Sequence, residues 1–336
     1  MGCTVVVDGF FGDAGKGKIV SYLSLKDDAE ICARAGVGPN AGHTVVMNNT
    51  TYKLRMIPCG FINPKTRLFI GPGVAVNPEI LLKEIAEHNV ERRVGIDPQC
   101  AIIENRHLEI DRSGHLSSII QTTGSGTGPC NADRALRIAK MAREFPELKR
   151  FIIDVPGEVN RALDEKKNVI VEATQGTYIS LYHGTYPFVT SKDVCASAAC
   201  SDVGIGPTRV DDVVIVFKSY VTRVGAGDLP GELSPDEVKR RGWDEYGTVT
   251  GRLRRASPFN FDLAKRAVML NGATQIALTK LDVLYPSCKG ITEFEKLCRE
   301  AKEFIQKIEE ELKLKVSLIG TGPSLEEIID RRKAYL

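Results

Sequence analysis

The sequence lacks the features that place a chain in a membrane or on a nucleic acid. It has no run of roughly 18 apolar residues that could cross a bilayer. Its N-terminus has neither the basic segment nor the long apolar core of a signal peptide. The 45 basic and 43 acidic side chains leave a net charge of only +2, which creates no global field to attract nucleic acid or an anionic membrane. Any anionic ligand must therefore be held by local clusters of residues.

The sequence also lacks paired cysteines. None of the nine cysteines forms a C-x-x-C pair, and no histidine stands at metal-ligand spacing from the closest two, Cys195 and Cys200. The pattern favours reduced, buried thiols over disulfides or zinc. We therefore expect a soluble cytoplasmic protein.

What the sequence does contain is a series of apolar runs that alternate with helical patterns. "TVVVDGF" is typical of a strand buried on both faces, and it is followed by a glycine loop, the helical pattern "KGKIVSYLSLK" and a second strand, "AEICARAG". This order is a βαβ unit, here within residues 1–45, and predicts a parallel sheet. The fold class expected is α/β, with a large, mostly parallel central sheet flanked by helices, similar to P-loop NTPases and carrying small insertions. The length allows two domains, but no clean boundary is visible within residues 1–336.

Further elements can be assigned along the chain. Residues 43–61 resemble a hairpin that turns at Asn48-Asn49, and residues 77–89 form a helical pattern with an Asn cap and a Pro at the first helical position. Other expected elements are a helix over 133–151 stopped or kinked by Pro146, a long strand over 211–224, a helix with an apolar stripe over 294–312, and a polar surface loop over about 100–135.

The first glycine loop, "DGFFGDAGKGK", resembles a phosphate loop. Its glycines let backbone N–H groups wrap a phosphate at a helix N-terminus, while Lys16 reaches the outer phosphates. Gly17 stands where the standard pattern has the Ser or Thr that ligates magnesium. Asp13 can replace that ligand, since hard divalent cations prefer carboxylates. A glycine cluster alone is usually a tight turn, but the position between a buried strand and a helix favours phosphate binding.

Two further loops follow predicted strands. "GVGPNAGHT" places Asn40 and His43 on flexible backbone, and a histidine in such a loop can act as an acid or charge stabiliser, although lone histidines are more often structural. "EATQGT" offers Gln175, and Thr190 follows shortly after; they can bond an amide-bearing ring or a phosphate, or serve ordinary turn chemistry. Because parallel sheets place ligands beyond the carboxyl ends of their strands, we expect these loops to form one site.

The last part of the chain carries two more signals. In "TKLDV", Asp282 can accept hydrogen bonds from N1–H and N2–H₂ of guanine, a donor pair that adenine lacks, and the T-K-x-D spacing is typical of GTP-binding proteins. In "TGRLRR", Arg252, Arg254 and Arg255 can pair with carboxylates, unless they form a solvated basic face.

Taken together, these pieces resemble the adenylosuccinate synthetase family. The family's signature is G-D-E-G-K-G-K followed by N-A-G-H-T, and this chain has "GDAGKGK" and "NAGHT". The further matching motifs follow the family's order: "TTGSGTGP", "EATQGT", "HGTYPFVTS", "TRVGAG", "TGRLRR", "TKLDV" and "TGP". The resemblance covers essentially the whole chain, although many members are longer.

The resemblance implies a C–N ligase of purine (AMP) biosynthesis. The family joins IMP to L-aspartate with GTP and Mg²⁺, and it forms adenylosuccinate, GDP and phosphate by way of 6-phosphoryl-IMP. It also implies one α/β ligase domain over 1–336, with the IMP-site loops at about 100–135 and the guanine-binding C-terminal part at about 260–336. Arg137 matches an arginine that family members offer to the IMP phosphate of the neighbouring subunit, which implies a homodimer.

Site roles follow residue by residue from the resemblance. Asp13 would take the N1 proton of IMP and ligate magnesium together with the Gly42 carbonyl. His43 would stabilise or protonate the β–γ bridging oxygen, and Lys16 would neutralise the transferring phosphoryl group; Gln175 completes this catalytic set. The implied GTP contacts are Gly12, Gly15, Lys16, Gly17, Lys18, Thr44, Lys280, Asp282 and Gly322. The implied IMP contacts are Asp13, Asn40, Thr123, Arg137, Gln175 and Thr190. The implied aspartate contacts are Thr250, Arg252 and Arg254.

The chain departs from the family pattern at a few positions. Ala14 replaces a Glu, Phe10-Phe11 replace a Gln-Trp pair, Ser125 replaces a common Arg and Val249 replaces a Thr. Val249 bears on one hydrogen bond to aspartate and Ala14 on a local loop contact.

Two other classes compete with the ligase. A regulatory GTPase or partition-type ATPase would normally keep the P-loop Ser or Thr and would need no arginine clamp for carboxylates. A nucleotide-binding interaction module would need neither an acid nor a base beside its phosphate loop.

Overall fold

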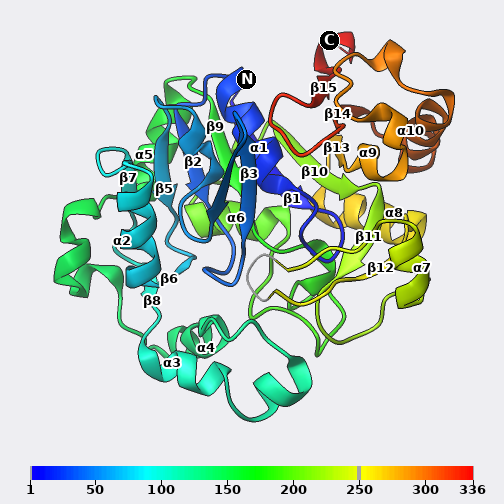
Figure 1. The fold of residues 1–336 in the computed structure, drawn as a ribbon. Coiled ribbons are helices and arrows are strands. Elements are labelled where there is room, and N and C mark those ends of the chain that lie inside the picture. Colours follow the sequence, from blue (N-terminus) through cyan, green and yellow to red (C-terminus); the bar gives the residue numbers. More distant parts are fainter. Residues whose placement is uncertain (1, 248–250, 336) are drawn as a thin grey trace.

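The computed structural model describes residues 2–247 and 251–335. Its centre is a nine-stranded sheet in the order β15-β14-β13-β10-β1-β9-β2-β5-β7, with helices packed around it (Figure 1). Adjacent strands are parallel except at β15, which pairs antiparallel with β14. The predicted α/β fold with a mostly parallel central sheet is confirmed. The strands of this sheet are β1 (Cys3–Asp8), β2 (Ile31–Arg34), β5 (Arg67–Ile70), β7 (Val94–Ile96), β9 (Val169–Glu172), β10 (Asp212–Lys218), β13 (Gln275–Thr279), β14 (Val316–Gly320) and β15 (Ile328–Asp330).

Helices cover the sheet, and three two-stranded pairs extend from it. The α-helices are α1 (Lys16–Lys26), α2 (Pro78–Glu87), α3 (Asn105–Asp111), α4 (Thr127–Leu136), α5 (Val155–Asp164), α6 (Ala196–Val203), α7 (Pro235–Arg240), α8 (Phe261–Asn271), α9 (Leu281–Leu284) and α10 (Arg299–Leu312). The pairs are β3 (His43–Met47) with β4 (Thr50–Leu54), β6 (Ala75–Val76) with β8 (Ala101–Ile102), and β11 (Tyr220–Arg223) with β12 (Arg255–Pro258).

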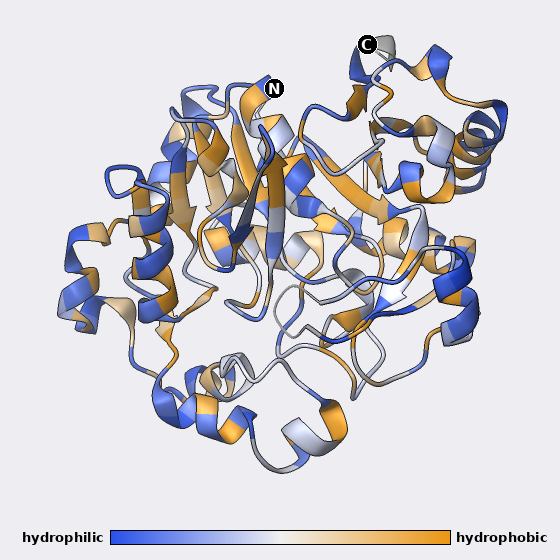
Figure 2. Cartoon of the chain, in the orientation of Figure 1, coloured by the Kyte–Doolittle hydropathy of each residue, from blue (hydrophilic) through white to orange (hydrophobic). Residues whose placement is uncertain are grey.

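Two hydrophobic cores hold the sheet, one on each face. Successive side chains of a strand point to opposite faces, so Val5 and Val7 of β1 join one core and Val6 joins the other. Figure 2 shows the strands largely apolar and the outer helices polar on their exposed sides. All nine cysteines lie in the described residues, and eight of them are buried, as predicted. None of the described helices has the length and hydrophobicity to span a membrane.

Local sequence signals explain several elements. Asn77 caps α2 by accepting a hydrogen bond from the backbone N–H of Ile80 at 3.0 Å. Asn48 and Asn49 both adopt positive φ, at 49° and 60°, and turn the β3–β4 hairpin. The predictions of this helix and this hairpin are confirmed.

The helix expected over 133–151 is wrong beyond Leu136. Arg137 adopts a left-handed conformation with φ 67°, and the N–H groups of Arg137 and Ile138 bond back to the last turn of α4. Met141 then forms an antiparallel bridge with Ala101 of β8, and the chain continues as two short 3₁₀ turns. This pairing with a distant segment overrides the helical pattern.

Three other boundaries also differ from the expectation. The strand over 211–224 is interrupted at Ser219, which bonds to the backbone of Thr279 and Lys280, so β10 and β11 belong to different sheets. The helix expected from residue 294 begins only at Arg299, after a 3₁₀ turn, although its apolar stripe is buried. The stretch 100–135, expected to be loop, contains α3 and α4.

Candidate active site

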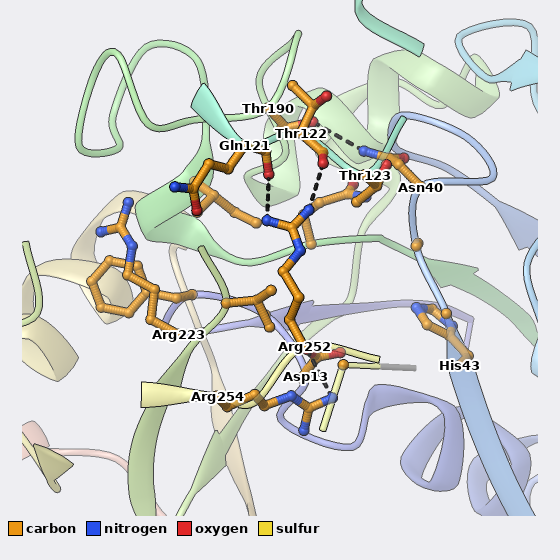
Figure 3. Close-up of a pocket in the computed structure, with 18 of the residues that line it drawn as sticks. Asp13, Asn40, His43, Gln121, Thr122, Thr123, Thr190, Arg223, Arg252 and Arg254 are labelled. Atoms are coloured by element: carbon orange, nitrogen blue, oxygen red, sulfur yellow. Dashed lines mark hydrogen bonds and ion pairs between the residues drawn. The ribbon is translucent and has the colours of Figure 1, made fainter. Parts of the chain in front are cut away.

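The carboxyl ends of the central strands open into a cavity of about 880 Å³. The three glycine loops predicted to form one site all contribute to its lining, and so does the start of the "TKLDV" segment. The predicted site residues that line it are Gly12, Asp13, Gly15, Lys16, Gly17, Lys18, Asn40, Gly42, His43, Thr44, Thr123, Gln175, Thr190, Arg252, Arg254, Lys280 and Gly322. Asp282 and Arg137 do not line the cavity, and Thr250 lies outside the described residues. Figure 3 shows part of this wall.

The phosphate loop is shaped by a carboxylate at its first residue. Asp8, the last residue of β1, accepts hydrogen bonds from the backbone N–H groups of Phe10, Gly12 and Ala14 at 2.8–3.2 Å. The ammonium of Lys16 lies 3.2 Å from the same carboxylate and 2.5 Å from the carbonyl of Gln175. The loop is therefore held in place without a ligand, and Lys16 bridges it to the end of β9.

Gly17 lies in the first turn of α1, where this helix packs against β3. A Cβ atom at this position would lie 3.1 Å from the sulfur of Cys59, 3.2 Å from Cβ of His43 and 3.2 Å from the carbonyl of Thr44. Contacts of this length are tighter than most Cβ contacts, so the neighbours would have to move by a few tenths of an ångström. A Ser or Thr, as in the standard phosphate loop, would be crowded here, because the first turn of α1 packs directly against the strand that carries His43.

Behind the phosphate loop, three charged or titratable groups form a buried cluster. Arg34 ends β2 and Glu172 ends β9, and the two are register partners in neighbouring parallel strands. Arg34 Nη1 lies 2.9 Å from Oε1 of Glu172, and Nδ1 of His43 hydrogen-bonds to the same oxygen. The other oxygen of Glu172 accepts the N–H of Cys59 at 2.6 Å.

The surroundings of this cluster set its charges. Burial, followed by the charge of Arg34, lowers the pKa of His43 to about 4, so the imidazole is neutral at neutral pH. Burial raises the pKa of Glu172, but its contacts with His43 and Arg34 outweigh burial and lower it to about 2. Nε2 of His43 is buried and has no hydrogen-bond partner among the described residues.

One end of the cavity is lined by amides and hydroxyls. The side-chain nitrogen of Asn40 donates to the hydroxyl of Thr190 at 3.3 Å (Figure 3). The hydroxyl of Thr123 donates to Ser125 at 2.8 Å. Oδ1 of Asn40 and Nε2 of Gln175 are buried with no partner in the described part of the chain. Unsatisfied buried groups of this kind are costly, so they mark places where a ligand can supply the missing bonds.

The arginine cluster reaches into the same cavity. Arg252 donates to the carbonyls of Gln121 at 2.9 Å and Thr122 at 2.6 Å (Figure 3). Arg254 Nη2 lies 3.0 Å from the carboxylate of Asp13, and its Nη1 pairs with Glu245. The alternative of a solvated basic face fails for Arg254, which is buried.

Glu245 gathers three further groups beside Arg254. Its carboxylate bonds Lys218 at 2.8 Å and the hydroxyl of Tyr220, and it lies 3.6 Å from the ammonium of Lys280. Burial opposes ionisation, but the charges of Lys218, Lys280 and Arg254 hold the pKa of Glu245 well below its usual value. Glu245 therefore links the arginine cluster to the loop that follows β13.

The loop after β13 is tied to the phosphate loop. The hydroxyl of Thr279 donates to the carbonyl of Ala14 at 2.6 Å, and Lys18 donates to the carbonyl of Gly322 at 2.6 Å. Burial lowers the pKa of Lys18 to about 8. Oδ1 of Asp282 is buried without a partner among the described residues. Lys18 thus ties α1 to the loop after β14, and it also lines the cavity.

Arg137 stands apart from the cavity on an exposed surface. Its neighbours Leu136 and Ile138 are 67% and 61% exposed, which is unusual for large apolar side chains.

Sequence reasoning missed Asp8, Arg34, Glu172 and Glu245. The signals for the first three were present, because each is a charged residue that ends an apolar strand run. For Glu245 there was no comparable signal.

These features define a class of protein, a nucleotide-dependent enzyme built on a parallel α/β sheet with a phosphate loop after its first strand. Comparisons with known proteins identify the family. A family model described as adenylosuccinate synthetase matches residues 5–145 and 136–289. The adenylosuccinate synthetase of Methanocaldococcus jannaschii is 55% identical over 98% of this chain and 97% of its own length, and that of Methanosphaera stadtmanae is 52% identical over the full length of both.

Solved structures agree with the sequence comparisons. A fully ligated adenylosuccinate synthetase from Plasmodium falciparum superposes with a TM-score of 0.92 at 26% identity, and the match covers 98% of this chain and 99% of that one. A succinoaminodeoxyadenylate synthetase of cyanophage S-2L gives 0.79 at 25% identity, over 98% and 95% of the two chains. The chain belongs to the adenylosuccinate synthetase family. It is therefore a C–N ligase that joins IMP and aspartate in a GTP-dependent step of purine biosynthesis, and the competing classes of switch and interaction module are set aside.

Proposed function

We propose that this cavity carries out both steps of the family reaction. In the first step, the 6-oxygen of IMP attacks the γ-phosphorus of GTP, the bond to the β–γ bridging oxygen breaks, and Asp13 accepts the N1 proton of IMP. In the second step, the amine of aspartate attacks C6, the C6–O bond of 6-phosphoryl-IMP breaks, and phosphate leaves as the amine loses a proton. Phosphorylation is needed because an unmodified 6-oxygen is a very poor leaving group.

In this proposal, His43 and Lys16 act on the transferring phosphoryl group. His43 interacts through Nε2 with the bridging oxygen as GDP leaves, and the buried, unpartnered state of this atom supports that role. Lys16 moves from Asp8 to the phosphates and balances their charge.

The three substrates occupy different parts of the cavity. GTP lies along the phosphate loop (Gly12, Gly15, Gly17, Lys18) and Thr44, with its guanine against Lys280, Asp282 and Gly322. IMP takes the end lined by Asn40, Thr123, Gln175 and Thr190, where the unpartnered atoms of Asn40 and Gln175 support the assignment. Arg252 and Arg254 bind the carboxylates of aspartate.

The ion pair of Arg254 with Asp13 is the observation that carries this proposal. It places a carboxylate-binding arginine 3.0 Å from the group assigned as the base. A GTP-hydrolysing switch has no use for this arrangement, whereas a ligase must bring an amino diacid to the position where the purine has been activated. Aspartate and IMP would break this ion pair when they bind.

The oxygen donors around the phosphate loop fit magnesium. The carboxylate of Asp13 and the carbonyl of Gly42 both line the cavity, and hard oxygen ligands of this kind suit the ion. When bound, magnesium would neutralise charge on the phosphates.

We also propose that the protein works as a homodimer in the cytoplasm. Arg137 lies outside the cavity of its own chain, and the exposed apolar side chains of Leu136 and Ile138 beside it suit an interface. Arg137 would then reach the IMP phosphate of the partner.

A substrate-omission assay tests the ligase reaction. Phosphate release should require GTP, IMP and aspartate together, and equal turnover with GTP alone would contradict the proposal. Asp13→Asn removes the base, so activity should fall by at least about 100-fold while nucleotide binding persists. Full activity in that variant would remove the assignment of Asp13.

A further inference from the structure

Glu172 is a fully buried carboxylate to which the proposed reaction assigns no role. Both of its oxygens are engaged, one by Arg34 and His43 and the other by the N–H of Cys59. An ionised carboxylate carries no hydrogen, so the hydrogen in its contact with His43 belongs to Nδ1. We therefore assign Nδ1 as the donor to Glu172, because a ring that accepted from Nη1 of Arg34, 2.7 Å away, would turn the lone pair of Nδ1 towards the carboxylate oxygen. Arg34 donates separately to the same carboxylate oxygen.

This contact determines which edge of the imidazole faces the cavity. With Nδ1 bound to Glu172, Nε2 is the ring nitrogen left for a ligand, and it has no partner among the described residues. Rotation of the ring by half a turn would break the contact between Nδ1 and Glu172. The carboxylate of Glu172 would then lose one of its hydrogen-bond donors. The buried carboxylate thus opposes any other orientation of His43.

The register of the central sheet holds Glu172 itself. Arg34 and Glu172 end adjacent parallel strands and stand opposite each other, and both side chains are fully buried. Removing one member of a buried pair leaves an uncompensated charge, so each fixes the other. The sheet, and not a mobile loop, therefore sets the position of the carboxylate.

A metal centre is the alternative interpretation of this cluster. Ligand atoms of His43, Cys59 and Glu172 lie within 4.8 Å of one another. However, Nη1 of Arg34 lies only 2.7 Å from Nδ1 of His43. A cation placed among these atoms would meet that fixed positive charge at close range. The cluster is better suited to orienting His43 than to holding an ion.

We propose that Glu172 is a positioning residue for catalysis, which fixes the tautomer and orientation of His43 so that Nε2 faces the bridging oxygen of bound GTP. The inference rests on the proposed role of His43 and deepens it. Glu172 places a carboxylate at the Nδ1 edge of the ring, opposite Nε2, where it can stabilise positive charge that develops on the ring as GDP leaves. The arrangement of an acting group and a second group that orients it is common among catalytic histidines.

Glu172→Gln tests the inference, with Glu84→Gln as the matched control. Glu84 is also a buried carboxylate, but it accepts the backbone N–H groups of Arg55, Met56 and Ile57 and does not contact His43. Glu172→Gln should lower kcat by about 100-fold and change the KM values by less than about threefold. Glu84→Gln should keep kcat within about threefold. Wild-type kcat in a folded Glu172→Gln variant would overturn the inference.

The double variant separates positioning from a structural effect. If Glu172 acts through His43, then Glu172→Gln should not lower kcat further in a His43→Asn background. Multiplicative losses in the double variant would show an independent structural role and overturn the inference. Should Glu172→Gln fail to fold, Glu172→Asp, which keeps the charge but withdraws the carboxylate, takes its place with the same expectations.

A spectroscopic readout keeps the inference distinct from the proposed function. Histidine-selective ¹⁵N labelling should show a protonated Nδ1 for His43 in the wild type and a changed tautomer in Glu172→Gln. An Nε2-protonated neutral ring in the wild type would contradict the inference. Full kcat in His43→Asn would contradict the proposed role of His43, whereas an inactive His43→Asn beside a fully active Glu172→Gln would contradict the inference alone.

Discussion

Replacement of Gly17 by alanine gives opposite predictions from helix propensity and from packing. Gly17 lies in the first turn of α1 at an ordinary helical φ, where alanine normally stabilises a helix by about 1 kcal/mol. Here the new methyl group would meet Cys59, His43 and Thr44 at 3.1–3.2 Å. Such overpacking costs about 1–3 kcal/mol. We therefore expect Gly17→Ala to destabilise the protein.

The size of this effect can be measured by thermal unfolding. Set against the helix gain of about 1 kcal/mol, the overpacking leaves a net loss of up to about 2 kcal/mol. With about 2 cal/mol/K of unfolding entropy per residue, that loss lowers Tm by up to about 3 °C in a chain of this length. Activity should fall more sharply, by about tenfold, because the strand that moves carries His43. Gly17→Ser should lose at least as much, although it restores the residue of the standard phosphate loop.

Gly206→Ala is the control for this prediction. A Cβ at Gly206 would meet its nearest atom only at 4.0 Å, and the residue has an ordinary negative φ. This variant should keep its activity and its Tm, or gain slightly in stability. A Gly17→Ala protein that is more stable than the wild type and fully active would refute the packing argument.

Three further variants test separate parts of the account. Asp282→Asn should lower kcat/KM for GTP by about 10- to 100-fold relative to xanthosine triphosphate, because the hydrogen bonds from guanine to the charged carboxylate are lost. An unchanged preference for GTP would show that Asp282 does not bind the guanine. Arg254→Ala should raise the KM for aspartate by at least about tenfold. The control Arg255→Ala removes only a partly exposed ion pair with Glu232 and should leave this KM unchanged. Equal effects of the two variants would contradict the assignment of Arg254 to the aspartate carboxylates. The pKa of Glu172 is lowered to about 2 in the folded state, so its contribution to stability is complete above its ordinary value of 4.5 and is lost as the pH falls towards 2. Tm measured from pH 5 to pH 2.5 should therefore fall less steeply in Glu172→Gln than in the wild type, and parallel curves would contradict this.

The sequence predicted the sheet and the convergence of its loops for a physical reason. Buried parallel strands carry β-branched runs, and their carboxyl ends meet at one edge, so residues that follow such runs come together. This reasoning placed Asp13, His43 and Gln175 around one cavity. The single domain over 1–336, the catalytic roles and the homodimer stay predictions.

What the sequence could not predict depends on partners far apart in the chain. Arg34 and Glu172 are separated by 138 positions, and only the order of strands β9 and β2 makes them neighbours. The position of Glu245 in the site depends on its bonds with Lys218, Tyr220 and Arg254, which come from other segments of the chain. The helix expected over 133–151 was wrong for the same reason, because pairing with β8 outweighs local pattern.

The loss of the standard Ser or Thr at Gly17 also gains a structural explanation. The sequence indicated only that a magnesium ligand was missing and that Asp13 could replace it. In the structure, the small residue lets α1 approach β3 closely, and this brings His43 beside the phosphate loop. Ala14 has a buried side chain and an N–H bonded to Asp8, but nothing in the structure explains why it replaces the family's Glu.

In the proposed reaction, IMP is phosphorylated on its 6-oxygen before aspartate attacks. Turnover of IMP labelled with ¹⁸O at position 6, in the presence of GTP and aspartate, tests it most directly by mass analysis of the released phosphate. One ¹⁸O is expected in each phosphate formed, because the C6–O bond breaks and the oxygen leaves with phosphorus. Unlabelled phosphate, with its new oxygen taken from water, would contradict it.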